Sequence, residues 1–318
     1  MSSRYSLLIT RGLPPATESR ADSTYEVRRW DRRGPTLGEA ADGVDALLCT
    51  PADRLDASAI YSLSGSIRVI GTFSVGFEHI DLAAARARGT AIVNTPGVLS
   101  EATAEFTMLL ILPAARRAGQ GERQLRSGQW RGWSPATFLG TQVGDKRLGI
   151  LGMGRIGQAL ARMARGFGMK VHYRNRHRLD PAAEAGAIWH AEDSEFLASS
   201  DVLALCAPGG EETRHWLNAE RIGLLPQGAV VVNAARGSLV EDAALVAALR
   251  SGHVVAAGLD VFPDEPDVPA DYLTLENVVL TPHIASATWE TREAMGALVL
   301  DGIDAVLAGR RPGNLVEG

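Results

Sequence analysis

A glycine-rich turn between an apolar run and an amphipathic run places the strongest constraint on the fold. Residues 148–151 are apolar and predict a buried strand, residues 158–164 have a helical pattern, and GMGRIG at 152–157 separates them. In such a strand–turn–helix, the first glycine permits a tight turn, the second lets the backbone approach a pyrophosphate, and the third lets the helix pack close to the strand. The free N–H groups at the helix start would then face the phosphates.

The glycine spacing is weak by itself, because glycine supplies 34 of the 318 residues. An ordinary glycine-rich turn is the alternative interpretation, and the strand before the motif and the helix after it argue against that alternative. The motif therefore predicts a dinucleotide site formed by Gly152, Gly154, Arg155, Ile156 and Gly157.

Short aliphatic runs alternate with longer amphipathic stretches along the whole chain. Hydrophobic residues make up 46% of the composition, and a length of about 150 residues per domain suggests two domains. This alternation predicts an α/β fold in which helices cover parallel sheets. We expect strands at 5–10, 46–50, 68–72, 91–94, 148–151, 171–173, 202–206, 229–233 and 254–259, and helices at 100–117, 241–250 and 288–307.

The charge balance and the cysteines exclude several classes of protein. Lys and Arg number 32 against 37 Asp and Glu, whereas a general nucleic-acid binder usually has a basic footprint. Cys49 and Cys206 are the only cysteines, too few for a disulfide framework or a C-x-x-C zinc site. The apolar stretch 106–115 is broken by Pro113, and a membrane span needs about 20 apolar residues. We expect a cytoplasmic protein without a metal site, nucleic-acid partner or membrane span.

The second strand of the predicted nucleotide unit is followed by arginines where an NAD-binding fold usually has a carboxylate. The sequence reads RNRHR at 174–178, and no acidic residue occurs before Asp180. A carboxylate would bind the ribose 2′-hydroxyl and repel a 2′-phosphate, whereas guanidinium groups grip a phosphate. We therefore expect NADPH to be preferred over NADH, with Arg174, Asn175 and Arg176 at the phosphate. The alternative is a solvated arginine cluster.

Three further segments follow the glycine turn in a fixed order. They are NAARG at 233–237, GLDVFPDEP at 258–266 and TPHIASAT at 281–288. With GMGRIG, this series resembles the D-isomer-specific 2-hydroxyacid dehydrogenase family over nearly the whole chain, and within it the glyoxylate/hydroxypyruvate reductases. No single segment is specific, but the ordered set is. The resemblance implies two Rossmann-like parallel-sheet domains, with a nucleotide-binding domain inserted into a flavodoxin-like substrate domain.

The resemblance and the local breaks together suggest where these domains begin and end. Pro96-Gly97 interrupts the chain just before the helix expected from Ser100. We expect residues 1–98 and 287–318 to form the substrate-binding (catalytic) domain and residues 99–286 to form the dinucleotide-binding Rossmann domain. The resemblance also implies a cleft that closes over the substrate, and a homodimer formed through the helix from Ser100 and the arm that follows it to about Gly140.

The chemistry of the family explains three residue types. Reduction of a 2-oxo acid moves hydride to the carbonyl carbon, and the oxygen then needs a proton, for which an imidazolium is the natural donor near neutral pH. The resemblance assigns that role to His283. It assigns Glu265 to the carboxylate that orients the ring and favours its charged form, and Arg236 to the guanidinium that holds the substrate carboxylate. Taken singly, these residues have plainer interpretations: a loop-anchoring salt bridge, a solvated charge and a packing histidine.

The resemblance implies further contacts. The adjacent amides of Val75 and Gly76 would receive the substrate carboxylate together with Arg236 and His283. Asp260 would bind the nicotinamide carboxamide, or alternatively cap a loop. Many relatives have His at the position of Cys206, so this chain departs from the family pattern in this loop. The remaining cofactor contacts implied are Cys206, Pro208, Ala234, Arg236, His283 and Ser286.

Two alternatives fit the same motifs. Formate and phosphite dehydrogenases share much of the motif set but oxidise a hydride-bearing anion. A nucleotide-sensing corepressor retains the fold and the catalytic residues without turnover. A panel of 2-oxo acids, formate and phosphite distinguishes the two enzyme classes, and any turnover argues against the sensor.

Overall fold

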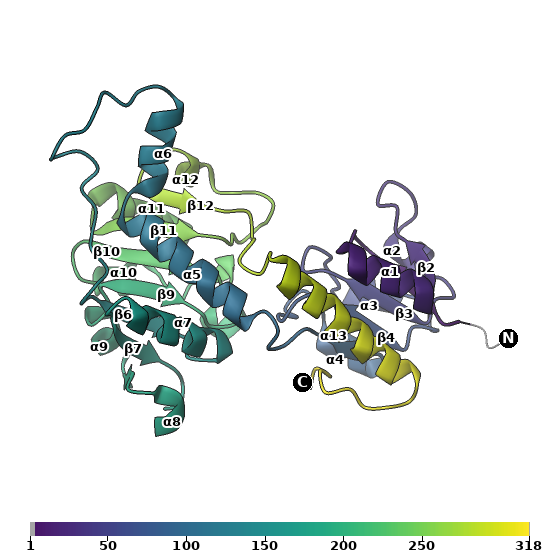
Figure 1. Ribbon diagram of the computed structural model, residues 1–318. Helices are drawn as coiled ribbons and strands as arrows, with labels where there is room; N and C mark the ends of the chain where they lie inside the picture. Colours follow the sequence, from purple (N-terminus) through teal and green to yellow (C-terminus); the bar gives the residue numbers. More distant parts are fainter. Residues whose placement is uncertain (1–3, 318) are drawn as a thin grey trace. The chain divides into compact units, whose positions relative to one another are not determined.

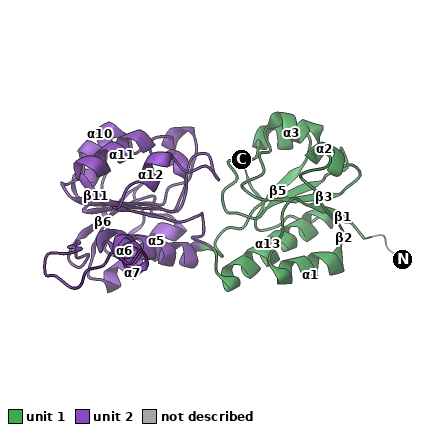
Figure 2. Cartoon of the chain, turned by 90° about the horizontal axis from the view of Figure 1, so that it is seen from above, with its two compact units in different colours: residues 1–99, 287–318 green, residues 100–286 purple. Residues whose placement is uncertain are grey.

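The computed structural model describes residues 4–317 and divides into two compact units (Figures 1 and 2). The first unit comprises residues 1–99 and 287–318, and the second comprises residues 100–286. Each unit contains one sheet in which all paired strands run parallel. The predicted α/β class with two parallel-sheet domains is therefore confirmed.

The first unit contains a five-stranded sheet with the order β2-β1-β3-β4-β5. Helices α1 and α13 lie on one face of this sheet, and α2 and α3 lie on the other (Figure 2). Its strands are β1 Ser6–Ile9, β2 Glu26–Arg29, β3 Ala46–Cys49, β4 Val69–Thr72 and β5 Ala91–Val93. Its helices are α1 Pro15–Thr24, α2 Leu37–Ala40, α3 Ala57–Ser62, α4 Leu82–Ala87 and α13 Trp289–Leu307.

Local signals explain where the helices of the first unit begin. Asp56 and Asp81 accept hydrogen bonds from the amides of Ala59 and Ala84, at 3.0 and 2.9 Å, and so cap α3 and α4. On the sheet, Gly71 of β4 lets α13 approach closely, because a Cβ there would lie 2.8 Å from a side-chain carbon of Val299. The long C-terminal helix is thus packed directly on β4.

The second unit contains a seven-stranded sheet with the order β12-β11-β10-β9-β6-β7-β8. Helices α5 and α7 lie on one face and α10 and α11 on the other (Figure 2). Its strands are β6 Arg147–Leu151, β7 Lys170–Arg174, β8 Ile188–Trp189, β9 Val202–Leu205, β10 Ala229–Asn233, β11 Val254–Leu259 and β12 Val278–Leu280. Its α-helices are α5 Ser100–Ala115, α6 Ala118–Arg126, α7 Arg155–Gly166, α8 Pro181–Glu184, α9 Asp193–Ala198, α10 Ala219–Gly223, α11 Asp242–Ser251 and α12 Ala270–Leu273.

The order of the strands fixes where ligands can bind. In the second sheet the chain reverses its direction of progress between β6 and β9, and in the first sheet between β1 and β3. Ligands of open parallel sheets bind beyond the carboxyl ends of the strands near such a reversal. The glycine turn follows β6 and therefore lies at the reversal of the second sheet.

Two features are absent from residues 4–317. Within this range no helix is both long and apolar enough to cross a membrane. The same residues contain no group of three or more His, Cys, Asp or Glu side chains placed to share a metal ion.

Candidate active site

The glycine turn has little room for side chains at two of its three glycines. Gly152 has a φ of 93°, and a Cβ there would lie 2.6 Å from the amide nitrogen of Ala207. A Cβ on Gly157 would lie 2.4 Å from the carbonyl oxygen of Gly152. Both glycines are thus required by the close approach of β6, α7 and the loop after β9.

The middle glycine and the start of α7 leave an open cradle suited to a pyrophosphate. Among residues 4–317, apart from its chain neighbours, no atom lies within 4 Å of the position that a Cβ of Gly154 would occupy. Helix α7 begins at Arg155 without a side-chain cap. Its first helical hydrogen bond runs from the backbone N–H of Gln158 to the carbonyl oxygen of Gly154, at 2.9 Å. The N–H groups of Arg155, Ile156 and Gly157 therefore precede the helical hydrogen-bond ladder. This arrangement fits a dinucleotide.

The arginine segment after β7 separates into structural and accessible groups. The Nε of Arg174 lies 2.8 Å from a carboxylate oxygen of Asp193, which also binds Arg221 at 2.9 Å. Arg174 was predicted as a phosphate ligand, but the structure engages its guanidinium with Asp193. The side chain of Arg176 is 83% exposed and forms an ion pair of 3.1 Å with Glu212, which is 79% exposed. Arg176 is therefore the stronger candidate for binding an anion, because an exposed ion pair is readily exchanged.

Asn175 supports the glycine turn from the neighbouring strand. Its side-chain oxygen accepts a hydrogen bond of 2.7 Å from the amide of Met153, and its carbonyl oxygen accepts one of 3.4 Å from the Trp189 indole. Asn175 was predicted to contact a phosphate, but in the structure its side-chain oxygen is used to hold the turn. Its side-chain NH₂ can still donate to a ligand.

Arg236 follows β10 and is fixed by its own loop. The side chain of Asn233, at the end of β10, donates to the carbonyl of Arg236 at 2.8 Å and accepts from the amide of Ala235 at 3.0 Å. The next residue, Gly237, lies against the backbone of Phe262, where a Cβ would come within 2.0 Å of the carbonyl carbon. The arginine is thus placed beside the loop that follows β11.

The residues after β11 and β12 form a paired acid and base. Nδ1 of His283 lies 2.7 Å from Oε2 of Glu265, and the amide of Phe262 donates to Oε1 of Glu265 at 3.0 Å. Burial alone would raise the pKa of Glu265, but the hydrogen bond and charge of His283, the Phe262 amide and the charge of Arg236 lower it below its ordinary value. Both side chains remain more than a third exposed, so Nε2 of His283 is accessible to a small molecule.

Asp260 organises the loop that carries His283. It is fully buried, its carbonyl accepts the amide of His283 at 2.8 Å, and its carboxylate accepts the amides of Ile284 and Ala285 at 2.9 and 2.8 Å. The Thr281 hydroxyl donates to the same carboxylate at 2.6 Å. Of the two interpretations offered for Asp260, the loop-capping one describes these contacts.

The other predicted cofactor contacts lie at the same edge of the sheet. Cys206 follows β9, and its amide donates to Leu151 at 2.8 Å. Burial raises the pKa of its thiol to about 12, so it stays protonated at neutral pH. Pro208 is exposed and Ala234 is half-buried, as is Ser286, the last residue of the second unit.

Val75 and Gly76 belong to the first unit and follow β4, where both are partly exposed.

Sequence reasoning missed several polar residues that hold the loops of the two units, notably Asn94, Asn233 and Asp193. Asn94 and Asn233 shared a usable signal, because each is a polar residue at the end of an apolar run. Asp193 had none, because its two arginine partners lie 19 and 28 positions away.

Comparison with known proteins identifies the family. Residues 108–285 match the family described as "D-isomer specific 2-hydroxyacid dehydrogenase, NAD binding domain". The chain is 43% identical over 313 residues to a glycerate dehydrogenase of Hyphomicrobium methylovorum, covering 96% of this chain and 97% of that protein. It is 39% identical over 319 residues to a glyoxylate reductase of Thermococcus litoralis, covering 98% and 96%.

The chain belongs to the D-isomer specific 2-hydroxyacid dehydrogenase family. A solved relative is the NADPH-dependent glyoxylate/hydroxypyruvate reductase of Sinorhizobium meliloti in complex with NADP and malonate, with a TM-score of 0.87 and 32% identity over 99% of this chain and 97% of that one. The segment that matches the NAD binding domain contains the glycine turn, Arg236, Glu265 and His283. The second unit of this dehydrogenase is therefore its nicotinamide-cofactor domain.

Proposed function

We propose that this dehydrogenase reduces small 2-oxo acids, glyoxylate and hydroxypyruvate foremost, to 2-hydroxy acids with NADPH. The observation that carries the proposal is the contact of 2.7 Å between His283 and Glu265 beside the loop that holds Arg236. An imidazole that is oriented by a carboxylate and lies near a fixed guanidinium suits proton donation to an anionic carbonyl compound. The names of the relatives, glyoxylate reductase and glycerate dehydrogenase, support the same substrate class.

Each residue has a separate task in the proposed reaction. The dihydronicotinamide, when bound, supplies the hydride. Nδ1 of His283 is held by Glu265, so Nε2 is the nitrogen that donates a proton to the substrate oxygen as negative charge develops there. Arg236 binds the substrate carboxylate, and the N–H groups of Val75 and Gly76 contribute two further donors to that carboxylate.

The dinucleotide would be held at several points. The N–H groups at the start of α7, with Gly152, Gly154 and Gly157 clearing the space, would bind the pyrophosphate. The loops that contain Cys206, Pro208, Ala234 and Ser286 would line the remainder, and Asp260 would shape the nicotinamide end through the loop it holds.

Arg176 is the group that we propose selects NADPH over NADH. Its side chain is the most exposed of the three arginine side chains at 174–178, with 83% against 24% for Arg174 and 62% for Arg178, and no carboxylate follows β7 before Asp180. Arg176→Ala removes charge-assisted bonds to the 2′-phosphate, so kcat/KM for NADPH should fall about 10–100-fold while the value for NADH changes little. Arg250→Ala, which removes a guanidinium of the same unit that is 55% exposed and paired with Asp271, is the control. An equal loss with both cofactors in Arg176→Ala contradicts the assignment.

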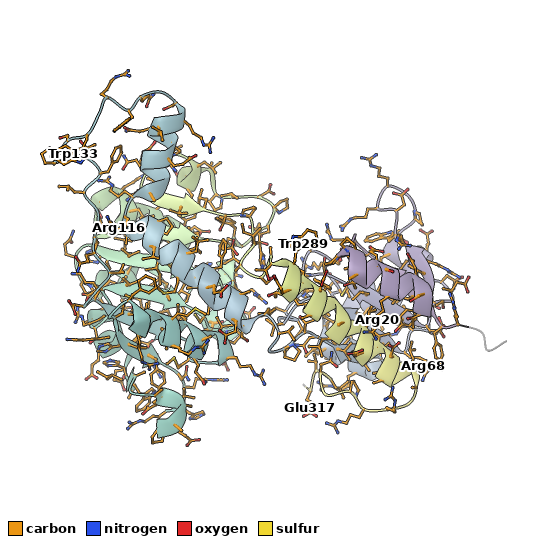
Figure 3. All side chains as sticks on the ribbon, in the orientation of Figure 1. Arg20, Arg68, Arg116, Trp133, Trp289 and Glu317 are labelled. Atoms are coloured by element: carbon orange, nitrogen blue, oxygen red, sulfur yellow. The ribbon has the colours of Figure 1, made fainter. Side chains whose placement is uncertain are left out.

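We further propose a homodimer formed through α5, α6 and the arm to Gly140. Large apolar side chains in this region are exposed, with Trp133 at 84%, Leu139 at 67% and Leu125 at 62%. Figure 3 shows Trp133 on the loop that projects beyond α6. Such a concentration of exposed apolar side chains is typical of an interaction surface. Sedimentation equilibrium tests it, and a monomer at micromolar concentration contradicts it.

The function itself is tested by a substrate panel. Glyoxylate, hydroxypyruvate and pyruvate are assayed with NADPH and with NADH, and formate and phosphite with the oxidised cofactors, all by the absorbance of the reduced nicotinamide. We expect the highest kcat/KM for glyoxylate or hydroxypyruvate with NADPH. Turnover of formate or phosphite alone, or a higher kcat/KM with NADH, contradicts the corresponding part of the proposal.

A further inference from the structure

Two consecutive carbonyl groups in the loop after β4 are each bound by a different group of the first unit. The carbonyl of Ser74 accepts the amide of Thr95 at 2.8 Å, and the carbonyl of Val75 accepts the side-chain amide of Asn94 at 2.7 Å. In a trans peptide unit the C=O and the following N–H point in opposite directions. The two hydrogen bonds therefore fix where the N–H groups of Val75 and Gly76 point, and within residues 4–317 neither N–H has a hydrogen-bond partner.

The next carbonyl is held by a chain of side chains. The Ser74 hydroxyl donates to the carbonyl of Gly76 at 2.6 Å, and it lies 2.8 Å from the hydroxyl of Thr72. Nε2 of His79 lies 3.0 Å from the same Thr72 hydroxyl. A hydroxyl has one hydrogen to donate, so Thr72 must donate to Ser74 and His79 must donate to Thr72. The order is thus His79 to Thr72 to Ser74 to Gly76, with the hydrogen on Nε2.

Burial makes these bonds durable. Thr72 is 0% exposed, Ser74 7% and Asn94 8%, so water competes little for their hydrogen bonds, and successive bonds in a chain strengthen one another. The backbone of Asn94 is also fixed, because its carbonyl accepts the side-chain amide of Asn314 at 2.7 Å. The C-terminal segment thereby supports the side chain that holds Val75.

We propose that Asn94 is a positioning residue that aims the N–H of Gly76 at a ligand carboxylate, and that His79, acting through Thr72 and Ser74, is a second one that holds Gly76 in place by its carbonyl. This inference rests on the proposed function, because the carboxylate is that of the 2-oxo acid. These side chains do not touch the substrate. They hold the peptide units in place before it arrives, so that the donors need no reorganisation when the anion binds.

The first test compares two substitutions of Thr72. Thr72→Val keeps the shape of the side chain but breaks the chain of hydroxyls, and Thr72→Ser keeps the hydroxyl. We expect KM for glyoxylate to rise about tenfold or more in Thr72→Val, with a smaller change in kcat, an unchanged KM for NADPH, and near-normal values in Thr72→Ser. Thr17→Val is the matched control, because the Thr17 hydroxyl is buried in the same unit without a hydrogen-bond partner.

A second variant and a second measurement keep the inference testable. Asn94→Ala frees a different peptide unit and should also raise KM for glyoxylate, so a poorly folded Thr72→Val does not end the test. Separately, the ¹⁵N amide resonances of Val75 and Gly76 are followed during titration with oxamate, a non-reacting 2-oxo acid analogue. We expect shifts in the wild type and Thr72→Ser, with weaker binding in Thr72→Val and Asn94→Ala.

The outcomes separate the inference from the proposed function. If the wild type reduces glyoxylate and both Thr72→Val and Asn94→Ala match Thr17→Val in KM, the positioning role is overturned while the function stands. If the wild type reduces no 2-oxo acid, the proposed function fails and the oxamate titration decides the inference. In that case, unshifted Val75 and Gly76 amides overturn it, and shifts that Thr72→Val weakens support it.

Discussion

Each unit has a buried aspartate in a loop that follows one of its strands, and the two carboxylates are stabilised by different kinds of donor. Asp53, in the loop after β3 of the first unit, is 3% exposed. Its carboxylate binds two cations, Arg11 Nε at 3.2 Å and Arg32 Nη1 at 2.9 Å, and accepts the Thr10 hydroxyl at 2.6 Å. Asp53 therefore connects three loops: its own loop after β3, the loop after β1 that contains Thr10 and Arg11, and the loop after β2 that contains Arg32.

Asp260, directly after β11 of the second unit, is 0% exposed. Its carboxylate accepts two backbone amides, from Ile284 and Ala285, and the hydroxyl of Thr281. These donors are all neutral and belong to the single loop that carries His283.

The difference shows what each carboxylate does. The arginine side chains that bind Asp53 are 37% and 43% exposed. If the carboxylate is removed, water can therefore replace part of the hydrogen bonding that their guanidinium groups lose. Of the two residues whose amides bind Asp260, Ala285 is buried, so its N–H is less easily rehydrated, whereas Ile284 is 37% exposed. We infer that Asp53 contributes to stability alone, whereas Asp260 also sets the shape of a catalytic loop.

The largest expected effect tests whether the loop held by Asp260 performs the chemistry. His283→Gln removes the proposed proton donor, and kcat for glyoxylate should fall about 10²–10⁴-fold with little change in KM for NADPH. His253→Gln is the matched control, because His253 lies in the same unit and its side chain hydrogen-bonds to Gln227 and to the carbonyl of Ile222. Turnover of His283→Gln within a few-fold of the wild type would overturn the assignment.

A smaller effect is expected from Asp260→Asn, which tests the coupling of shape to activity. Both carboxylate oxygens accept hydrogen bonds, so either orientation of the new amide sets an NH₂ against a donor. The free energy of unfolding should fall by about 2 kcal/mol. We also expect kcat to fall about tenfold, because the backbone N–H of His283 is hydrogen-bonded to the carbonyl of the same aspartate. Urea unfolding and steady-state kinetics measure the two quantities. A loss of stability with unchanged kcat would show that the loop shape does not control the chemistry.

The sequence predicted the buried parts of the fold well and the exposed edges poorly. Every apolar run expected to be a strand is one, within one or two residues at its ends. Strand β2 was missed because its sequence, EVRR, is largely exposed and has no apolar run. Strands β8 and β12 were missed because they have two and three residues. Burial creates the pattern that a reader of the sequence can detect: the edge strand β5 is mostly buried and was predicted, whereas the edge strands β2 and β8 are largely exposed.

The candidate site was predictable where its residues lie within short, contiguous sequence motifs. The glycine turn and the segments containing Arg236, Glu265 and His283 are contiguous motifs. The contacts that hold these segments were not predictable, because they join distant residues. Arg174 and Asp193 are 19 positions apart, and Asp260 and Ala285 are 25 apart. The pairing of strands brings such groups together, so the ion pair between Arg174 and Asp193 left no signal in the sequence.

The smallest expected effect comes from the same substitution in the first unit, Asp53→Asn. Burial alone would raise the pKa of Asp53, but hydrogen bonds from Thr10 and Thr50 and the charge of Arg11 lower it below its ordinary value. The carboxylate therefore stabilises the fold above the pKa of an unfolded aspartate, about 3.9, and this contribution is lost as the pH falls through the lower folded value. At pH 7 the variant should lose about 1–2 kcal/mol of unfolding free energy with unchanged kcat.

Urea unfolding of both proteins at several pH values measures this contribution. The difference in unfolding free energy between the wild type and Asp53→Asn should shrink as the pH falls below about 4, because protonation makes the two side chains alike in charge. If the difference stays constant down to pH values near 3, the ion pairs with Arg11 and Arg32 do not stabilise the unit. If kcat falls as it does in Asp260→Asn, the contrast between the two aspartates is wrong, and Asp53 also shapes a functional loop.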